Sequence, residues 1–80
     1  MTKKNIAIEE TYTLALQNHK KNNLKLAEKL YKEILNIDPD HFQSIFLLGT
    51  LSVQTKKFYE AKQLLKKAIQ INSNHSAAHN

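Results

Sequence analysis

Cysteine and arginine are missing from this 80-residue chain, and glycine and proline occur once each. Without cysteine no disulfide can cross-link the fold, and its absence fits a reducing compartment. Because helix-breaking residues are so few, and leucine, lysine, alanine, glutamate and glutamine are frequent, the composition favours helix. Eighty residues allow one domain with a small core, so we expect modest stability.

Long hydrophobic runs are also missing, and none approaches the ~18 apolar residues of a membrane-spanning helix. Residues 1–8 look like the start of a signal peptide, but Glu9 and Glu10 interrupt it. We therefore expect a cytoplasmic protein with no membrane partner. The same two glutamates are expected at a helix start, where they complement the helix dipole instead of performing acid–base catalysis.

Charge of one sign prevails, because the net charge is +5 and all twelve basic residues are lysine. Nucleic-acid sites usually recruit arginine for its planar guanidinium, and the lysine, asparagine and isoleucine content is typical of a compositional bias. We expect the lysines to cover a solvated outer face. A basic face that binds nucleic acid is the alternative, but aromatic residues interleaved for base stacking are missing, so nucleic acid is not an expected partner.

The sequence repeats itself after 34 residues, so that residues 8–41 align with residues 42–75. Identical residues occupy six pairs of positions: Leu14/Leu48, Ala27/Ala61, Leu30/Leu64, Lys32/Lys66, Ile37/Ile71 and His41/His75. The ends of the two copies match as well, residues 38–41 with residues 72–75. A repeat of this length, with each copy built from two amphipathic stretches, predicts a stack of helix pairs.

Breaks in the helical pattern divide each copy in two. Turns are predicted at residues 21–23 and 55–57, and the second helix of the first copy is predicted to end near Asn36, ahead of Pro39. Asp40 with Gln43 resembles a capping box and predicts where the next helix begins.

The two copies resemble the tetratricopeptide repeat, which combines a Leu-Gly pair, a distant alanine and a closing proline at a period of 34 residues. The matching residues are Leu14-Ala15, Ala27, Tyr31 and Pro39, then Leu48-Gly49, Ala61, Leu65 and Ser73. The resemblance implies an all-α fold of antiparallel helix-turn-helix repeats, stacked as a short α-solenoid. The helices are expected to cross at Leu14, Ala15, Ala27, Leu48, Gly49 and Ala61, since small residues permit close approach.

We expect one domain over residues 1–80, with repeat 1 at 8–41, repeat 2 at 42–75 and a partial or capping third repeat at 76–80. Asn74 could cap the helix of that third repeat. Stacked repeats bury their faces only against neighbours, and about three are needed for stability. The chain is therefore interpreted as a piece of a longer solenoid; the alternative is a short protein whose last helix caps the stack.

First helices line the concave groove in tetratricopeptide proteins, so this resemblance directs attention to their free faces. The candidate partner-binding residues share an i, i+4, i+7 spacing: Tyr12, Leu16 and His19, then Phe46, Thr50 and Val53. Apolar surface of this kind often marks an interaction site. The alternative is that Tyr12, Phe46 and Leu47 pack between adjacent first helices. His19 and Lys20 at the rim would favour an acidic flank on a ligand.

No catalytic, cofactor-binding or metal-binding residues are predicted. Gly49 is the one glycine, so a glycine-rich phosphate loop is impossible, and no nucleophile has a base beside it. His75 and His79 would share a helix face but lack a third zinc ligand. We do not expect an enzyme or a cofactor.

The sequence favours a scaffold that binds a protein or peptide on the concave face of its first helices. One alternative is the amino-terminal repeat region of a larger bacterial transferase, because residues 27–35 look like repeats that precede sulfotransferase or glycosyltransferase domains. Another is a self-associating module, in which the groove meets a second copy to form a homo-oligomer.

Overall fold

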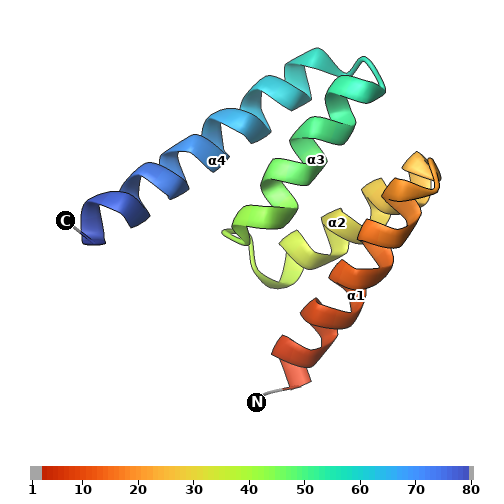
Figure 1. The fold of residues 1–80 in the computed structure, drawn as a ribbon, viewed down its shortest axis with the longest axis horizontal. Helices are drawn as coiled ribbons and strands as arrows, with labels where there is room; N and C mark the ends of the chain where they lie inside the picture. The colour runs from red at the N-terminus through yellow and green to blue at the C-terminus, as the bar shows by residue number, and fades with distance from the viewer. Residues whose placement is uncertain (1–2, 80) are drawn as a thin grey trace.

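Four helices form over residues 3–79, for which the structure, a computed structural model, describes the backbone; side chains are described for residues 6–72. Their bounds are α1 (Lys3–Lys20), α2 (Leu24–Ile37), α3 (Phe42–Gln54) and α4 (Phe58–His79) (Figure 1). No strand forms within these residues. The prediction of an all-α fold is confirmed.

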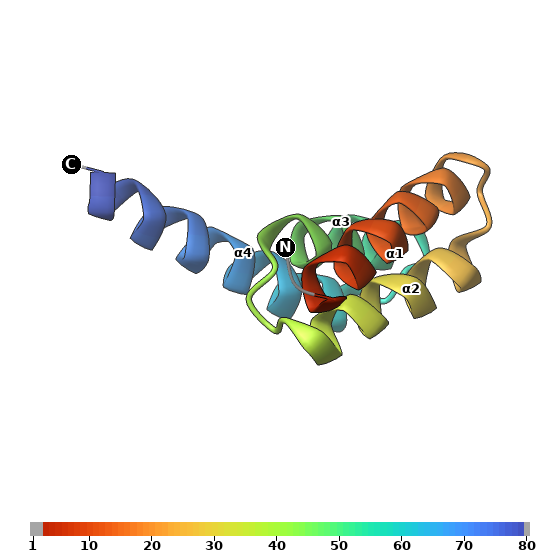
Figure 2. The same cartoon turned by 90° about the horizontal axis from the view of Figure 1, so that it is seen from below.

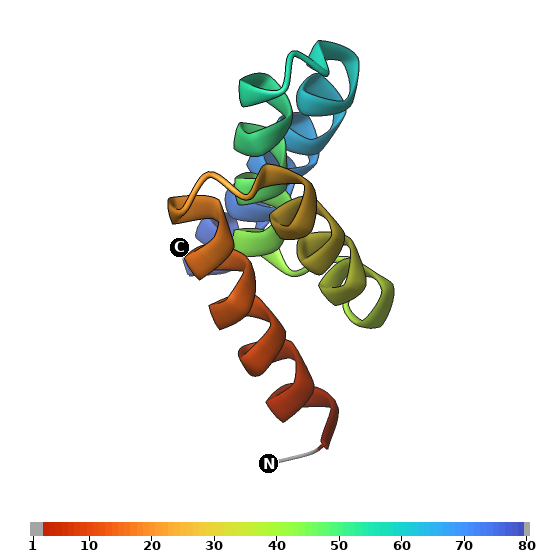
Figure 3. The ribbon, with the colours of Figure 1, turned by 90° about the vertical axis from the view of Figure 1, so that its right-hand side faces the viewer.

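The helices pack as two antiparallel pairs, α1 with α2 and α3 with α4, and α2 also contacts α3. Figure 2 shows α3 on the same side as α1, while the far end of α4 extends beyond the other three helices. Looking onto the first pair, α1 and α2 run alongside each other from the turn that joins them (Figure 3). This is the arrangement of a short α-solenoid.

The turns within the two pairs have the same backbone geometry, 34 residues apart. Asn22 and Lys56 both adopt the left-handed conformation, with φ of 67° and 63°. In each turn the following amide donates a hydrogen bond of 2.8 Å to a carbonyl five residues back: Asn23 N to Asn18 O, and Lys57 N to Ser52 O. This pattern is a Schellman motif, which closes the carboxyl end of a helix. The turns predicted at 21–23 and 55–57 are confirmed.

The core lies between the pairs. Ala15 of α1, Ala27 and Tyr31 of α2, and Leu48 and Leu51 of α3 form one buried cluster. Tyr31 is fully buried despite its hydroxyl, so most of the apolar contact between the repeats is centred on one ring.

Gly49 explains the close approach of α3 to α4. A methyl group added there would meet the Leu65 side chain at 2.9 Å and the Leu64 Cβ at 3.3 Å. Ala15 occupies the same position in the first pair and is completely buried. The prediction of small residues at the helix crossings is confirmed at these two positions, and Ala27 and Ala61 are buried as well.

Leu14 is not part of a helix crossing, and that prediction is wrong. Its side chain is 50% exposed, whereas Leu48 in the second copy is 3% exposed. Leu48 faces the preceding repeat, because α2 contacts α3. Leu14 points to the corresponding side of α1, where no helix lies among residues 3–79.

Two predicted helix starts also need correction. Helix α3 is capped by His41, whose Nδ1 accepts a hydrogen bond of 3.3 Å from the Ser44 amide, and not by Asp40 with Gln43. The Asp40 amide is already bonded to the Asp38 carboxylate, which places Asp40 in the turn. Helix α1 begins at Lys3, so the glutamates at 9 and 10 lie beyond its first turn and do not serve the dipole there.

The break predicted between residues 72 and 75 does not form, because α4 continues to His79. Pro39 has no amide proton and disfavours helix in the residue before it, and both effects end the first repeat after Ile37. Ser73 has neither effect. Residues 76–79 therefore extend α4, while the predicted cap by the Asn74 side chain falls outside the side chains described.

Candidate protein-interaction surface

Six residues of α1 and α3 form the surface that we call the first-helix face: Tyr12, Leu16, His19, Phe46, Thr50 and Val53. The structure divides them by helix. The three on α1 are partly buried, and the three on α3 are exposed, with Phe46 at 47% and Val53 at 44%. The predicted surface is thus most open along α3.

Tyr12 is a packing residue that leaves one edge exposed. It contacts the buried cluster, and its ring meets the ring of His41 edge-on with centroids 5.5 Å apart. Burial raises the pKa of the Tyr12 hydroxyl. Leu47 also packs against the cluster. The alternative that these side chains fill the space between adjacent first helices therefore holds for Tyr12 and Leu47, but not for Phe46.

His19 joins three helices, a role that its sequence context did not reveal. Its Nδ1 lies 3.0 Å from the Tyr31 hydroxyl of α2, and its Nε2 lies 2.7 Å from Gln54 Oε1 of α3. Burial, followed by the nearby Tyr12, raises the pKa of Tyr31 to about 12, so its hydroxyl keeps its proton and can donate to Nδ1. Nε2 then carries the ring proton and donates to Gln54. Both ring nitrogens are therefore engaged within the fold.

On α3 the exposed surface is apolar in character. Phe46 stacks against Phe42, with centroids 6.1 Å apart and an interplanar angle of 12°. The Thr50 hydroxyl donates a 3.0 Å hydrogen bond to the Phe46 carbonyl, and so leaves its methyl group as the larger part of its outward surface. Val53 continues the row. A ligand that approaches α3 meets an aromatic ring, a methyl group and an isopropyl group in line.

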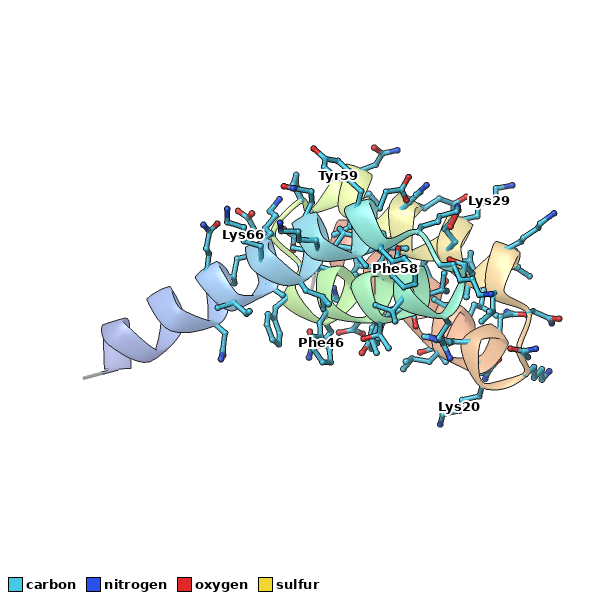
Figure 4. The ribbon with its side chains drawn as sticks, turned by 90° about the horizontal axis from the view of Figure 1, so that it is seen from above. Lys20, Lys29, Phe46, Phe58, Tyr59 and Lys66 are labelled. Carbon is cyan, nitrogen blue, oxygen red and sulfur yellow. The ribbon has the colours of Figure 1, made fainter. Side chains whose placement is uncertain are left out.

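The second helices carry most of the charge. Figure 4 shows Lys29, Tyr59 and Lys66 projecting along one edge of the molecule, and Phe46 and Lys20 along the other. The two faces of the stack therefore differ in chemistry, one apolar along α3 and one rich in lysine along α2 and α4.

Some lysines on the second-helix side are structural. Lys57 Nζ lies 2.9 Å from the Glu28 carboxylate and so joins the start of α4 to α2. Lys67 Nζ donates a 3.0 Å hydrogen bond to the Pro39 carbonyl in the turn before α3. The hydrogen bond from Lys57 lowers the pKa of Glu28, with a further contribution from the charge of Lys32. The prediction of a solvated outer face is therefore too simple for these residues.

Other kinds of site are absent from the described part of the chain. Among its side chains, no group of three histidine, cysteine, aspartate or glutamate residues comes close enough to hold a metal ion. The side chains of His75 and His79 lie outside those described. No helix of residues 3–79 is long and apolar enough to cross a membrane.

Two helix pairs, a 34-residue period and matching turns define this molecule as a helical-repeat protein of the tetratricopeptide type. Residues 16–80 match the family model described as "Anaphase-promoting complex, cyclosome, subunit 3", a family built from repeats of this type. The match covers more than half of the chain, which therefore belongs to this family. Tetratricopeptide repeats generally act as non-catalytic scaffolds for protein–protein interaction.

Proposed function

We propose that this chain is a scaffold that binds a protein or peptide on its first-helix face. The observation that carries the proposal is the exposed apolar row of Phe46, Thr50 and Val53 on α3. Val53 is nearly half exposed, although the core of this small protein would gain from burying it. Apolar side chains in one continuous row are typical of an interaction surface.

The ligand that fits best is an extended peptide or an amphipathic helix with two or three apolar anchors. Such ligands bind through alternate or i, i+4 side chains, and the row on α3 has the matching i, i+4, i+7 spacing. Lys20 is exposed at the end of α1, where it favours an acidic residue beside the anchors. His19 does not contribute to this rim, since its ring is engaged with Tyr31 and Gln54.

Several finer predictions from the sequence belong with this proposal. We propose that the scaffold has no catalytic activity, holds no cofactor and works in the cytoplasm. A second copy of the chain is the alternative occupant of the groove and would make the protein a homo-oligomer. The division into repeat 1 (8–41) and repeat 2 (42–75) is likewise proposed, and it is supported by the equivalent turns at Asn22 and Lys56.

The test is a peptide-display selection against the purified chain, followed by titration of a selected peptide against variants. Val53→Lys and Phe46→Ala should each weaken binding about tenfold, because each removes an apolar anchor of roughly 1.4 kcal/mol. The matched control is Leu26→Lys, since Leu26 has the same exposure as Val53 (45% against 44%) but lies on α2.

Lys29→Glu and Lys66→Glu complete the panel by changing only the charge of the second helices. The proposal predicts that both bind the peptide as the parent does. Loss of binding in these two variants, with Val53→Lys unaffected, would refute the first-helix face as the binding site. Sedimentation of the parent chain at several concentrations separates a second copy from a peptide as the occupant.

A further inference from the structure

A second apolar surface lies on α4 and is not part of the first-helix face. Phe58, Lys62, Leu65 and Ile69 are spaced at i, i+4, i+7 and i+11, which places them along one side of the helix; we call them the α4 stripe. Phe58 is 62% exposed and Ile69 is 66% exposed, more than any other leucine, isoleucine or phenylalanine among the exposed apolar residues of the described chain. Figure 4 shows Phe58 at the start of α4.

The first repeat shows how the same four positions are covered when a neighbouring helix is present. The equivalents on α2 are Leu24, Glu28, Tyr31 and Leu35. Tyr31 is fully buried, and both leucines pack against the cluster that contains Leu48 and Leu51 of α3. The carboxylate of Glu28 receives the ammonium group of Lys57, which follows α3. An α-helix lying on α4 as α3 lies on α2 would cover the α4 stripe in the same way.

The charge at the centre of the stripe is reversed. Lys62 stands where α2 has Glu28, and Lys66 borders the stripe one turn further along. In the first repeat the carboxylate belongs to the covered helix and the ammonium group to the chain that covers it. On α4 the roles are exchanged, so the covering helix must supply the carboxylate.

A second copy of this chain does not meet that requirement. Within the molecule, Lys32 lines a hollow of about 280 Å³ together with Tyr59 and Gln63. If another copy continued the stack, the same relation would place Lys66 beside Lys25 and Lys29 of that copy. Three lysines would then face one another, which opposes the contact.

The opposite end of the stack is also unsuited to cover α4. Where α3 buries Ile45 and Leu51 against α2, the equivalent positions of α1 are Thr11 and Gln17. A helix with these polar residues buries less apolar surface against the α4 stripe than α3 buries against α2. The sequence of α1 thus fits an outer face of the stack, while that of α4 fits an inner one.

From this pattern of exposure and charge we infer that the α4 stripe is a docking site for an acidic amphipathic helix of another protein. The helix places apolar residues on Phe58, Leu65 and Ile69, and a carboxylate beside Lys62. The site is separate from the first-helix face, so either surface can fail without the other.

The test uses α3 as the probe, because it is the helix that covers the equivalent surface of α2. Two peptides with the sequence of residues 42–57 are compared, one unchanged and one with Lys57→Glu. Each is titrated into the full chain, labelled with ¹⁵N, and followed by the amide signals of Phe58, Lys62 and Ile69. The Lys57→Glu peptide should bind about fivefold more tightly than the unchanged one at low salt, since it replaces a repulsion by an exposed ion pair.

Lys62→Glu in the chain should reverse that order and make the unchanged peptide the tighter ligand. Ile69→Lys should weaken both peptides about tenfold, and Phe58→Lys is the second variant should the first lose helicity. Leu14→Lys, at the opposite end of the stack, is the control that should bind as the parent does.

Three results would overturn the inference. One is the absence of any shift at these amides up to millimolar peptide, and another is a peptide preference that Lys62→Glu leaves unchanged. The third is a different occupant: self-association abolished by Ile69→Lys, or an oligothymidylate that shifts these signals while the Lys57→Glu peptide does not. Failure of Val53→Lys to affect a selected peptide would bear on the first-helix face alone.

Discussion

The two helix pairs contain equivalent residues that experience different surroundings. Leu14 and Leu48 occupy the same repeat position, yet one is half exposed and the other is buried. In the second helices the order is the opposite, since Leu24 and Leu35 are packed and Phe58 and Ile69 are exposed. A repeat position therefore does not define a core residue by itself; the presence of a neighbouring helix on the correct side does.

The comparison also shows that each pair carries one internal seam that needs no neighbour. Ala15, Ala27, Gly49 and Ala61 are all buried, in both copies. These positions lie between the two helices of a pair, so their burial is complete as soon as the pair forms. The variants below separate such intra-pair positions from those that depend on the stack.

The largest effect is expected from a charge in the seam. Ala27→Glu would bury an unpaired carboxylate at a position with no exposed surface, which costs several kcal/mol and should abolish the cooperative thermal transition. Ala61→Glu should destabilise somewhat less, because α4 has solvent on its far side. Circular dichroism melts decide, with Ala7→Glu on the exposed side of α1 as the control. A parent-like melt of Ala27→Glu would show that the helix register is wrong.

The next effect contrasts two equivalent leucines. Leu48→Ala should lower the free energy of unfolding by about 2–4 kcal/mol, since it leaves a cavity between α2 and α3. Leu14→Ala should cost less than about 1 kcal/mol, because half of that side chain is already in water. Urea denaturation of the two variants measures the difference. Equal losses would mean that a further helix covers Leu14 in solution.

A smaller effect, of opposite sign, is expected at the turns. Lys56 adopts the left-handed conformation at φ of 63°, which strains a residue with a Cβ atom. Lys56→Gly should therefore stabilise the protein by about 0.5–1 kcal/mol. Asn22→Gly should change stability little, because asparagine tolerates this conformation. Thermal melts of the two variants test the comparison, and a destabilised Lys56→Gly would contradict the Schellman geometry.

The smallest effect concerns pH and the ion pair between the repeats. Lys57 holds the pKa of Glu28 below its ordinary value of 4.5, so the pair stabilises the folded state above that pH. As the pH falls through the lowered pKa, Glu28 becomes protonated and the stabilisation is lost. Glu28→Gln should therefore be slightly less stable than the parent at pH 6 and equal to it near pH 3, measured by urea denaturation. A difference that persists at pH 3 would assign the effect to packing.

Much of this architecture followed from the sequence. The 34-residue offset, the turns at 21–23 and 55–57 and the small residues at 15, 27, 49 and 61 are local or pairwise features, and a helix pair forms wherever they coincide. The six residues of the first-helix face were also identifiable, since their spacing alone places them on two helix sides. Thr50 and Val53 could be predicted as exposed because the seam uses other positions.

Only the tertiary structure decided what depends on contacts between helices. It showed that His19 bonds to both Tyr31 and Gln54, residues 12 and 35 positions away, which no local pattern indicates. It showed that Leu14 is exposed while Leu48 is buried, and that α4 passes through residues 72–75 without a break. The physical reason is that helix periodicity is encoded within each segment, whereas burial and charge pairing depend on which segment lies opposite.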